Sequence, residues 1–364
     1  MLWLKLLAGF GLAVVLVGAL WAGATAGRRD HPSWKVLRRY RYAHRGLHDR
    51  GSGIPENSMA AFRLAREHGY GVELDVQLTG DGQLAVIHDK SLKRTTGVEG
   101  EVPRLSMAEL KRCRLEGTQE TIPTLEEVLE LFQGGPPLLV ELKADYFDIR
   151  ELVEKAVAAL DRYRVNYCIE SFHPGVVHWL RKHRPDICRG QLSQDFWRRR
   201  GELKGWQAFP MTHLLSNFLT RPDFISFHWA HRMLPAVWLC KHLHRLPVFC
   251  WTVRSRQTME QVEQEGCQVI FEGFLPAGQE LSAAPKASYK AGLPGSGTRA
   301  GQNYPIHGVT VHLAQGHCPR QSSGILGDRY QLRGDILTFS VQCAGISDSN
   351  GVAGLQAREI QICV

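Results

Sequence analysis

The sequence predicts an α/β protein whose main domain, at residues 38–277, is a distorted barrel of eight strand–helix units. Segments with strand and helix patterns alternate over about 235 residues, which is typical of parallel sheets with crossover helices. That length is close to the ~250 residues of a barrel with eight such units. Asp81-Gly82 is a strong hairpin signal that leaves no room for a crossover helix, so we expect one irregularity there.

The chain begins with an apolar segment, to which we assign residues 1–30. Residues 6–27 contain no charged side chain. A helix of this length measures roughly 33 Å, enough to cross a hydrocarbon core of about 30 Å. We therefore interpret the segment as a transmembrane anchor. A secretory signal peptide is the alternative, because Lys5 precedes the apolar run and Ala24-Thr25-Ala26 resembles a cleavage site.

Basic residues are concentrated on the carboxyl side of this segment, whereas only Lys5 precedes it. The positive-inside tendency therefore places the main domain on the cytoplasmic side of a membrane. With a cleaved signal peptide, the protein would instead be secreted. The basic residues that follow the segment are Arg28, Arg29, Lys35, Arg38, Arg39 and Arg41.

Residues 42–89 combine the first predicted elements of the barrel with several histidines and acids. Apolar and polar side chains alternate where we expect strands, and a capping residue followed by a glycine stop marks a helix between them. The expected elements are a strand at 41–44, a helix capped by Asn57 or Ser58 and ended by Gly69, a strand at 72–78 and a return strand at 84–88.

The hairpin allows a prediction of strand register. If Asp81 and Gly82 are its two central residues, Asp75 pairs with His88. Glu73, Asp75 and His88 then share one face, because side chains alternate along a strand. A slip of one residue would invert this arrangement. The predicted opposite face consists of Val72, Leu74, Val76, Ala85 and Ile87.

The rest of the domain continues the alternation, apart from residues 194–218, which show no clean period. Thr124 and Glu127 form a capping box at the start of one helix. The predicted helices cover residues 106–113, 124–132, 148–160, 175–183, 234–243 and 257–265. The predicted strands cover residues 138–142, 167–172, 187–192, 224–227, 248–253 and 269–271.

The composition changes after the barrel domain. Residues 278–302 are dense in Gly, Ala, Ser and Pro, which is typical of a flexible linker. Residues 303–364 contain short alternating runs at 309–313 and 336–341, so we expect a small β-rich or disordered extension, to which no role is assigned. We interpret its His307, His312, His317 and Cys318 as surface residues rather than metal ligands.

The net charge of +8 and the pI of about 9.1 favour anionic partners, such as phosphate esters or a phospholipid surface. The chain has no zinc-finger spacing, no RNA-binding aromatic signature and no long basic run, which argues against nucleic acid as a partner. The nine cysteines are scattered without a Cys-x-x-Cys pair, which favours a reducing compartment. Cys168, Cys188 and Cys250 suit small core positions. No pattern indicates an oligomeric state.

Three carboxylates are candidate ligands for a hard cation. Glu73 and Asp75 are two residues apart and project to one side of a strand, and Glu141 lies near the end of another strand. Such an all-oxygen set favours Mg²⁺ or Ca²⁺ over zinc, because it includes no thiolate. Taken alone, these acids would also suit ordinary surface positions.

His44 and His88 are candidates for proton transfer. Each ends a strand-like segment beside the acidic pair, and a reference pKa of about 6.5 suits imidazole to accept or donate protons near neutrality. Arg45 can bind a phosphoryl group through two N–H donors, and Lys143 can add a point charge, although either also suits an ion pair. Imidazoles beside a hard-cation site favour chemistry on phosphate esters.

These residues resemble those of the glycerophosphodiester phosphodiesterase family, and the matching motifs occur in order between Tyr40 and Pro276. Leu47-His48-Asp49, between the first two motifs, is similar to a bacterial branch with an N-terminal membrane segment. The motifs are His44-Arg45-Gly46, Glu56-Asn57-Ser58, Glu73-Leu74-Asp75-Val76 with Asp81-Gly82, His88-Asp89, Ile122-Pro123-Thr124-Leu125, Glu141-Leu142-Lys143, Trp251-Thr252-Val253 and Ile270-Phe271-Glu272-Gly273-Phe274.

The resemblance implies a distorted TIM barrel rather than an open doubly wound sheet. It also implies metal-dependent hydrolysis of glycerophosphodiesters to glycerol 3-phosphate and an alcohol, as in phospholipid and glycerol metabolism. In the family, a neighbouring hydroxyl of the substrate attacks phosphorus, and water then opens the cyclic phosphate. Two alternatives are a lysophospholipase D acting on lysophospholipids and, in another class, a catalytically inactive membrane-anchored binding protein.

The resemblance adds further candidate residues for substrate binding. Glu56 would touch the metal or orient a water molecule, and Asn57 would either join it or serve only as the helix cap. We expect Phe172 and Trp251 to line the pocket for the alcohol or acyl group, although an aromatic residue on a barrel strand also suits the core.

Overall fold

The computed structural model describes residues 1–144, 149–198, 203 and 205–276, together with the backbone of four strands between residues 305 and 363. The chain forms two compact units, Met1–Lys286 and Ala287–Val364. The catalytic candidates all lie in the first unit.

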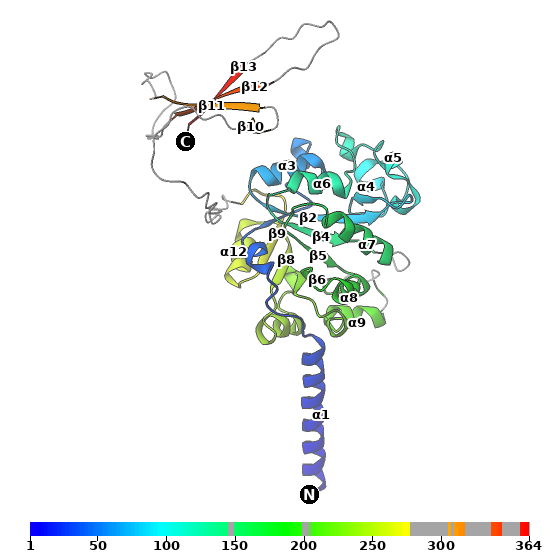
Figure 1. The fold of residues 1–364 in the computed structure, drawn as a ribbon. Helices are drawn as coiled ribbons and strands as arrows, with labels where there is room; N and C mark the ends of the chain where they lie inside the picture. Colours follow the sequence, from blue (N-terminus) through cyan, green and yellow to red (C-terminus); the bar gives the residue numbers. More distant parts are fainter. Residues whose placement is uncertain are drawn as a thin grey trace. The chain divides into compact units, whose positions relative to one another are not determined.

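The first unit contains a closed barrel of eight parallel strands (Figure 1), which confirms the predicted fold class. Strand β1 closes the ring by pairing in parallel with both β2 and β9. The barrel strands are β1 Tyr42–His44, β2 Gly71–Leu78, β4 Leu138–Leu142, β5 Tyr167–Ser171, β6 Arg189–Ser193, β7 Phe224–His228, β8 Val248–Val253 and β9 Gln268–Phe271.

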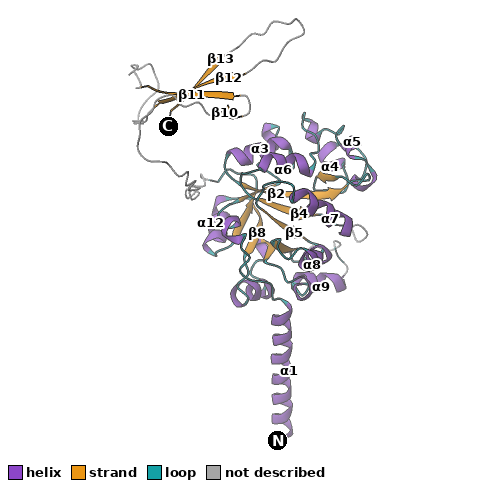
Figure 2. Cartoon of the chain, viewed as in Figure 1, coloured by secondary structure: helices purple, strands orange, loops and turns teal. Residues whose placement is uncertain are grey.

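Helices surround the strands of the barrel (Figure 2). The α-helices of the first unit are α1 Leu2–Ala24, α2 Trp34–Leu37, α3 Met59–Glu67, α4 Lys93–Thr96, α5 Met107–Leu110, α6 Leu125–Phe132, α7 Ile149–Leu160, α8 Pro174–His183, α9 Gly205–Thr212, α10 Asn217–Thr220, α11 Pro235–Trp238 and α12 Arg256–Gln264. Short 3₁₀ turns cover Arg50–Ser52, Val102–Arg104, Leu115–Gly117 and Trp229–His231, and a π-helical turn covers Leu239–Leu243.

Capping residues define the helix starts as the sequence indicates. Thr124 and Glu127 form the predicted capping box, in which each backbone N–H donates to the side chain of the other residue. Ser58, rather than Asn57, caps α3 by accepting from the backbone N–H of Ala61 at 3.1 Å. This cap leaves the side chain of Asn57 available for a different contact.

The hairpin after β2 is present, but its predicted register is wrong by one residue. Strand β3, Leu84–Val86, pairs antiparallel with β2 so that Val76 lies opposite Val86. The backbone N–H of Thr79 donates to the carbonyl of Gln83 at 2.9 Å, so three residues rather than two form the loop. Ala85 and Ile87 consequently pack in a different cluster from Val72, Leu74 and Val76.

The barrel interior is apolar at one end and polar at the other. The apolar layer includes Tyr42, Leu139, Cys168, Phe224 and Phe249. Gly190 admits the ring of Phe224, because a Cβ at Gly190 would lie 2.1 Å from that ring. Two positions further along the same strands, on the same inward face, come His44, Glu141, Glu170, Ser226 and Trp251. The polar layer therefore lies toward the carboxyl ends of the strands, where barrels of this type place their active sites.

Helix α1 is the one helix in the described part of the chain that is long and apolar enough to cross a membrane. Its last turn is attached to the barrel domain without a linker. Thr25 is fully buried, and its carbonyl accepts from the side chain of Asn217 at 3.0 Å. The carbonyl of Ala22 is 2.8 Å from Nε2 of His244. These contacts join the last turn of α1 to α10 and to the residue that follows the Leu239–Leu243 turn.

Two helices, α9 and α10, occupy the region where the sequence shows no clean period. Helix α9 contains Pro210, which removes a backbone donor and weakens a helical pattern. Helix α10 has only four residues, too few for periodicity to show. Both lie beside the carboxyl end of α1, since Trp21 contacts the ring of His213 edge-on and Asn217 contacts Thr25.

The second unit contains an antiparallel sheet in the order β10-β11-β12-β13. The runs at 309–313 and 336–341, noted in the sequence, lie inside β11 and β12. The expected linker at 278–302 lies outside the described residues, as do His307, His317 and Cys318, whereas His312 lies in β11. The strands are β10 Pro305–Ile306, β11 Val309–Gly316, β12 Ile336–Cys343 and β13 Ala357–Cys363.

Candidate active site

Glu73, Asp75 and Glu141 lie together at the carboxyl end of the barrel. Glu73 and Asp75 share a face of β2, and Asp75 is directly opposite Glu141 on β4. One carboxylate oxygen from each residue lies within 4.8 Å of the others, and all three side chains are buried. The structure therefore brings together the three acids that the sequence nominated as cation ligands.

Basic side chains pair with part of this negative charge. Nζ of Lys143 lies 2.9 Å from Asp75 and 2.8 Å from Glu141. Burial, reinforced by the charge of Asp75, raises the pKa of Glu73 well above its usual value. Burial also raises the pKa of Glu141, although Lys143 opposes the shift. For Asp75 the effect of burial is overcome, chiefly by Lys143, and the pKa is well below its usual value.

His44 ends β1 and faces this cluster. Its Nε2 is 3.8 Å from Oε2 of Glu73, and its Nδ1 hydrogen-bonds to Glu272. Burial lowers the pKa of His44 to about 4, although the hydrogen bond to Glu272 opposes the shift. Burial would raise the pKa of Glu272, but the hydrogen bond with His44 and the charge of Arg254 lower it to about 2. An ionised Glu272 fixes the His44 proton on Nδ1 and leaves Nε2 as the acceptor.

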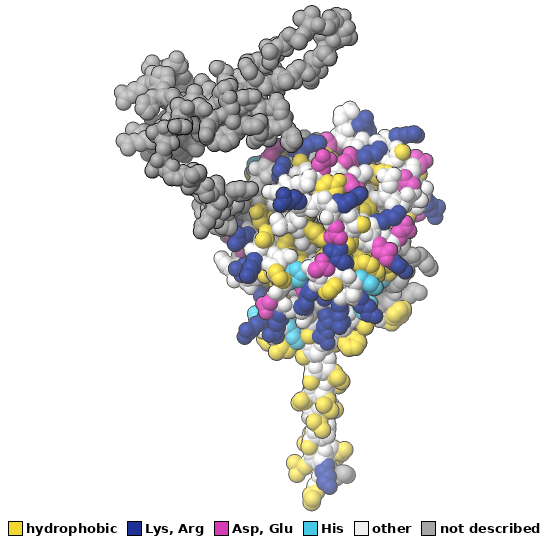
Figure 3. Space-filling view, in the orientation of Figure 1, with side chains coloured by type: hydrophobic (Ala, Val, Ile, Leu, Met, Phe, Trp, Pro, Cys, Tyr) yellow, Lys and Arg dark blue, Asp and Glu magenta, His cyan; other side chains and the backbone are white. Residues whose placement is uncertain are grey.

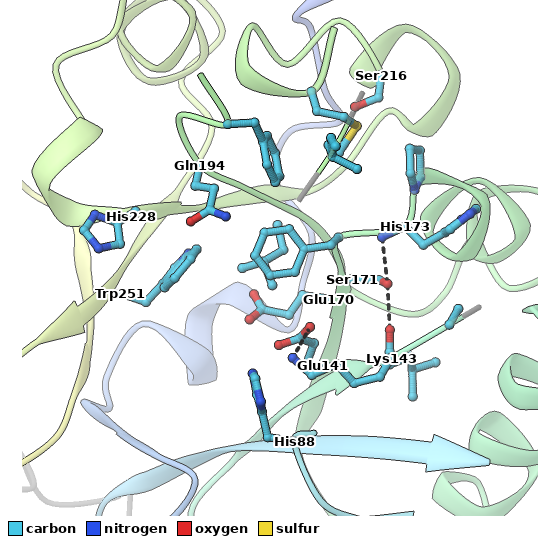
Figure 4. A pocket seen from close by; sticks show the side chains of 18 of the residues that line it. His88, Glu141, Lys143, Glu170, Ser171, His173, Gln194, Ser216, His228 and Trp251 are labelled. Atoms are coloured by element: carbon cyan, nitrogen blue, oxygen red, sulfur yellow. Dashed lines mark hydrogen bonds and ion pairs between the residues drawn. The ribbon is translucent and has the colours of Figure 1, made fainter. Parts of the chain in front are cut away.

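His88 also lies beside the three acids, but it is not part of the strand that was predicted to place it there. Strand β3 ends two residues earlier, at Val86, so the alternation of a strand no longer determines the direction of this side chain. In Figure 4 the His88 ring points toward Glu141. Its Nδ1 is 2.5 Å from Oδ1 of Asp89, and Asp89 is in turn paired with Arg94.

Arg45 and Asn57 contact the acids directly, and Glu56 contacts Arg45. Nη1 of Arg45 donates to Glu56 at 2.8 Å, and its Nε lies 3.3 Å from Asp75. The backbone N–H of Arg45 also donates to Glu73 at 3.0 Å. Nδ2 of Asn57 donates to Asp75 at 2.8 Å, which is a contact beyond that of a helix cap. Glu56 and Asn57 do not line the cavity, whereas Arg45 does.

A cavity of about 1080 Å³ opens above the acids (Figure 4). Its polar end is formed by His44, Glu73, His88, Glu141 and Lys143. Phe172 and Trp251 line it as expected, with their rings edge to face and their centroids 5.7 Å apart. The remaining wall is largely apolar and comes from α9, α10 and the segments beside them.

Four functional candidates lie beside the predicted ones but were not assigned from the sequence. Glu272 and Asp89 each bind Nδ1 of a candidate histidine, Arg94 pairs with Glu56, and Glu170 is a fourth buried acid at the cavity. Burial raises the pKa of Glu170 well above its usual value. An acid within an otherwise apolar strand was the available signal for Glu170, and the Ile270–Phe274 motif was the signal for Glu272.

Comparisons with known proteins match this chain to one enzyme family. Residues 44–274 match the glycerophosphoryl diester phosphodiesterase family, a range that includes all of the candidate site residues. A glycerophosphodiester phosphodiesterase of Bacillus altitudinis is 38% identical over 165 residues, which cover 42% of this chain and 66% of that protein. One from Caldanaerobacter subterraneus is 33% identical over 241 residues, which cover 63% of this chain and 91% of that protein.

A solved structure extends the comparison to the fold. A phosphodiesterase of Oleispira antarctica, in complex with the product sn-glycerol-3-phosphate, is 26% identical and superposes with a TM-score of 0.54. The match covers 67% of this chain and 95% of that one.

Proposed function

This chain belongs to the glycerophosphodiester phosphodiesterase family, and we propose that it hydrolyses glycerophosphodiesters to glycerol 3-phosphate and an alcohol at a site that binds a divalent cation. The observation that carries the proposal is the junction of β1, β2 and β4. Three buried carboxylates converge there beside two histidines, and Nδ1 of each histidine is hydrogen-bonded to a further carboxylate.

The donor set fits a hard cation. Glu73, Asp75 and Glu141 would hold the ion, because they offer only carboxylate oxygens and these oxygens lie close together. Burial and mutual repulsion disfavour the ionised form of Glu73, and a bound cation would relieve that cost. We propose Mg²⁺ or Ca²⁺ rather than zinc, since no thiolate or imidazole belongs to the cluster. When bound, the ion would polarise a phosphoryl oxygen and offset its developing charge.

The two histidines would move the protons of the reaction. One imidazole accepts the proton of the glycerol hydroxyl that attacks phosphorus, and the other protonates the departing alcohol oxygen. The resulting cyclic phosphate is opened by water with the two roles reversed. The acids on the two Nδ1 atoms, Glu272 for His44 and Asp89 for His88, orient the rings so that Nε2 carries out the transfer.

Arg45 and Lys143 would bind the phosphoryl oxygens. Both line the cavity and both are already held by acids, so their ordering on substrate binding costs little additional entropy. Phe172 and Trp251 would contact the alcohol or acyl portion of the substrate. Their edge-to-face packing supports a defined wall at that end of the cavity.

The proposal is tested by the turnover of glycerophosphocholine by the full chain in MgCl₂, CaCl₂ or EDTA. We expect turnover with at least one cation and none in EDTA. His88→Ala should lower kcat by about 10²–10⁴-fold, the usual contribution of a general acid or base. His68→Ala, at an exposed position, is the matched control. Unchanged turnover in His88→Ala would refute the histidine mechanism, and turnover in EDTA would refute the cation.

We also propose that α1 remains attached as an anchor, with the barrel domain on the cytoplasmic side. The buried Thr25 and its bond to Asn217 support retention, because cleavage after Ala26 would remove a segment that packs into the domain. The mass of the protein extracted from membranes should include the first 26 residues. A mature chain that begins at Gly27 would instead support the signal peptide.

A further inference from the structure

We propose that the enzyme docks against an anionic phospholipid surface and takes substrates that carry one acyl chain directly from that surface. The docking surface, here called the collar, consists of exposed apolar side chains on α9, α10, α11 and the Leu239–Leu243 turn. The inference rests on the proposed phosphodiesterase function and specifies its substrate class. The collar residues are Trp206, Phe209, Phe218, Leu219, Trp238 and Leu243.

The collar is unusual for a surface in contact with water. Each of its side chains is at least 49% exposed, and two are tryptophans. Soluble domains rarely expose large apolar side chains in such a group. Tryptophan and phenylalanine are the side chains that favour the boundary between lipid headgroups and acyl chains.

The collar is continuous with the proposed membrane anchor. The rings of Phe209 and His213 contact each other at a tilt, with centroids 4.7 Å apart, and His213 contacts Trp21 in the last turn of α1. On the other side, the carbonyl of Leu243 accepts from Arg29, which lies just after α1. Because Thr25 is already buried in the domain, no linker separates the end of α1 from the collar. An α1 that spans a bilayer therefore holds the collar at headgroup level.

The charge of the region suits anionic headgroups. The segments 205–222 and 228–250 contain no Asp or Glu, although they contribute Arg221 and Arg245. Arg232 and Lys241, in the same segments, both contact Glu265 instead. Arg221 donates to the carbonyl of Gly23 in α1, and Arg181 donates to the carbonyl of Leu219 in the collar. Hydrophobic and basic side chains lie together where α1 leaves the domain (Figure 3). Basic residues at this level are attracted to an anionic leaflet.

The same helices connect the collar to the active site. Trp206, Phe218 and Leu219 line the cavity whose other end holds Glu73 and Glu141. At about 1080 Å³ the cavity exceeds the ~300–1,000 Å³ typical of small-ligand sites. A glycerophosphodiester would occupy the polar end, and an acyl chain would lie along the apolar wall toward the collar.

The proposed chemistry limits the lipid to one acyl chain. In a lysophospholipid with a free 2-hydroxyl, that oxygen forms a bond to phosphorus and gives its proton to one histidine. The bond from phosphorus to the headgroup alcohol breaks, and the other histidine protonates the leaving oxygen. Water opens the cyclic phosphate and yields a monoacylglycerol 3-phosphate. A diacyl lipid has no free hydroxyl to attack and should not react.

The test compares two substrates in one preparation. The full chain is reconstituted in phosphatidylcholine vesicles with about 30 mol% phosphatidylglycerol. Choline release is measured from lysophosphatidylcholine in those vesicles and from glycerophosphocholine in the surrounding water. The test variant is Phe209→Glu combined with Leu243→Glu, because neither side chain lines the cavity. Val98→Glu, at a similarly exposed apolar position after α4, is the control.

We expect the wild type and Val98→Glu to hydrolyse both substrates and to spare the vesicle phosphatidylcholine. The double variant should keep its turnover of glycerophosphocholine within about twofold and lose about tenfold or more with lysophosphatidylcholine. If it loses both activities, Phe209→Ser with Leu243→Ser replaces it. The ratio of lysophosphatidylcholine turnover to glycerophosphocholine turnover then decides.

The contrary results separate this inference from the proposed function. Hydrolysis of glycerophosphocholine without hydrolysis of lysophosphatidylcholine would overturn the substrate class and leave the phosphodiesterase intact. An unchanged ratio in the collar variants would overturn the docking surface. A wild type that releases choline from neither substrate would overturn the proposed function, and this inference with it.

Discussion

Glu272→Gln tests whether the orientation of His44 supports catalysis. Glu272 is ionised and accepts the Nδ1 proton of His44, and Arg254 holds its other oxygen at 2.6 Å. A glutamine keeps the shape of this side chain but removes its charge. The His44 ring then loses a charged hydrogen-bond partner, and its Nε2 is less well fixed toward the site.

The expected loss follows from the strength of that hydrogen bond. A hydrogen bond to a charged group contributes about 1.5–3 kcal/mol. Since about 1.4 kcal/mol corresponds to tenfold in rate, kcat/KM should fall roughly 10- to 150-fold. The loss should lie mainly in kcat, because Glu272 is a positioning residue for His44.

The assay is the steady-state hydrolysis of glycerophosphocholine with saturating cation. Glu263→Gln is the control, since Glu263 also pairs with an arginine, Arg41, at 2.6 Å, but lies away from the cavity. Glu272→Asp, which restores the charge on a shorter side chain, should recover part of the activity. The positioning role of Glu272 is refuted if Glu272→Gln stays within about twofold of wild type, or if Glu263→Gln loses as much activity.

Three further predictions concern the cation, the core and the extension. Asp75→Asn should weaken cation binding and lower turnover at least about 100-fold, measured as turnover against Mg²⁺ or Ca²⁺ concentration, with Asp161→Asn as the surface control. Leu74→Ala, at a fully buried position, should cost about 2–5 kcal/mol of unfolding free energy in denaturant titrations, and Leu275→Ala, at an exposed position, should cost little. A chain that ends at Gly278 should keep full turnover of glycerophosphocholine, because every residue around the cavity precedes it.

Each of these predictions has a contrary outcome. An Asp75→Asn enzyme with normal cation dependence would remove Asp75 from the ligand set. Equal stability of Leu74→Ala and wild type would mean that the barrel wall relaxes around the deleted atoms. Loss of turnover on truncation would assign the extension a part in catalysis.

Local sequence signals were sufficient to predict most of the barrel. The strands at Leu138–Leu142 and Val248–Val253 have the predicted bounds, because continuous apolar runs between turn signals identify buried strands. The convergence of Glu73, Asp75 and Glu141 was also predictable, since residue spacing on a strand determines which face a side chain occupies.

The hairpin register and the partners of the histidines were not predictable in the same way. Asp81-Gly82 suits either a two- or a three-residue loop, and contacts of the loop with Leu105 and Met107 belong to a distant segment. Glu272 meets His44 only because the barrel closes between β9 and β1. Helices α9 and α10 were not predicted because neither has a regular apolar stripe. Their apolar side chains contact α1 and the cavity instead.

The closure of the barrel has a consequence for biosynthesis. His44 and Glu272 are separated by 228 positions, and β1 meets β9 only at the last seam of the ring. A ribosome makes α1 first, so the anchor proposed above would reach the lipid bilayer long before β9 exists. We therefore expect the growing chain to be inactive until β9 has been made, and products that end before β9 to lack activity. The proposed hydrolysis would begin only after β9, the last strand of the barrel, has been translated and has paired with β1.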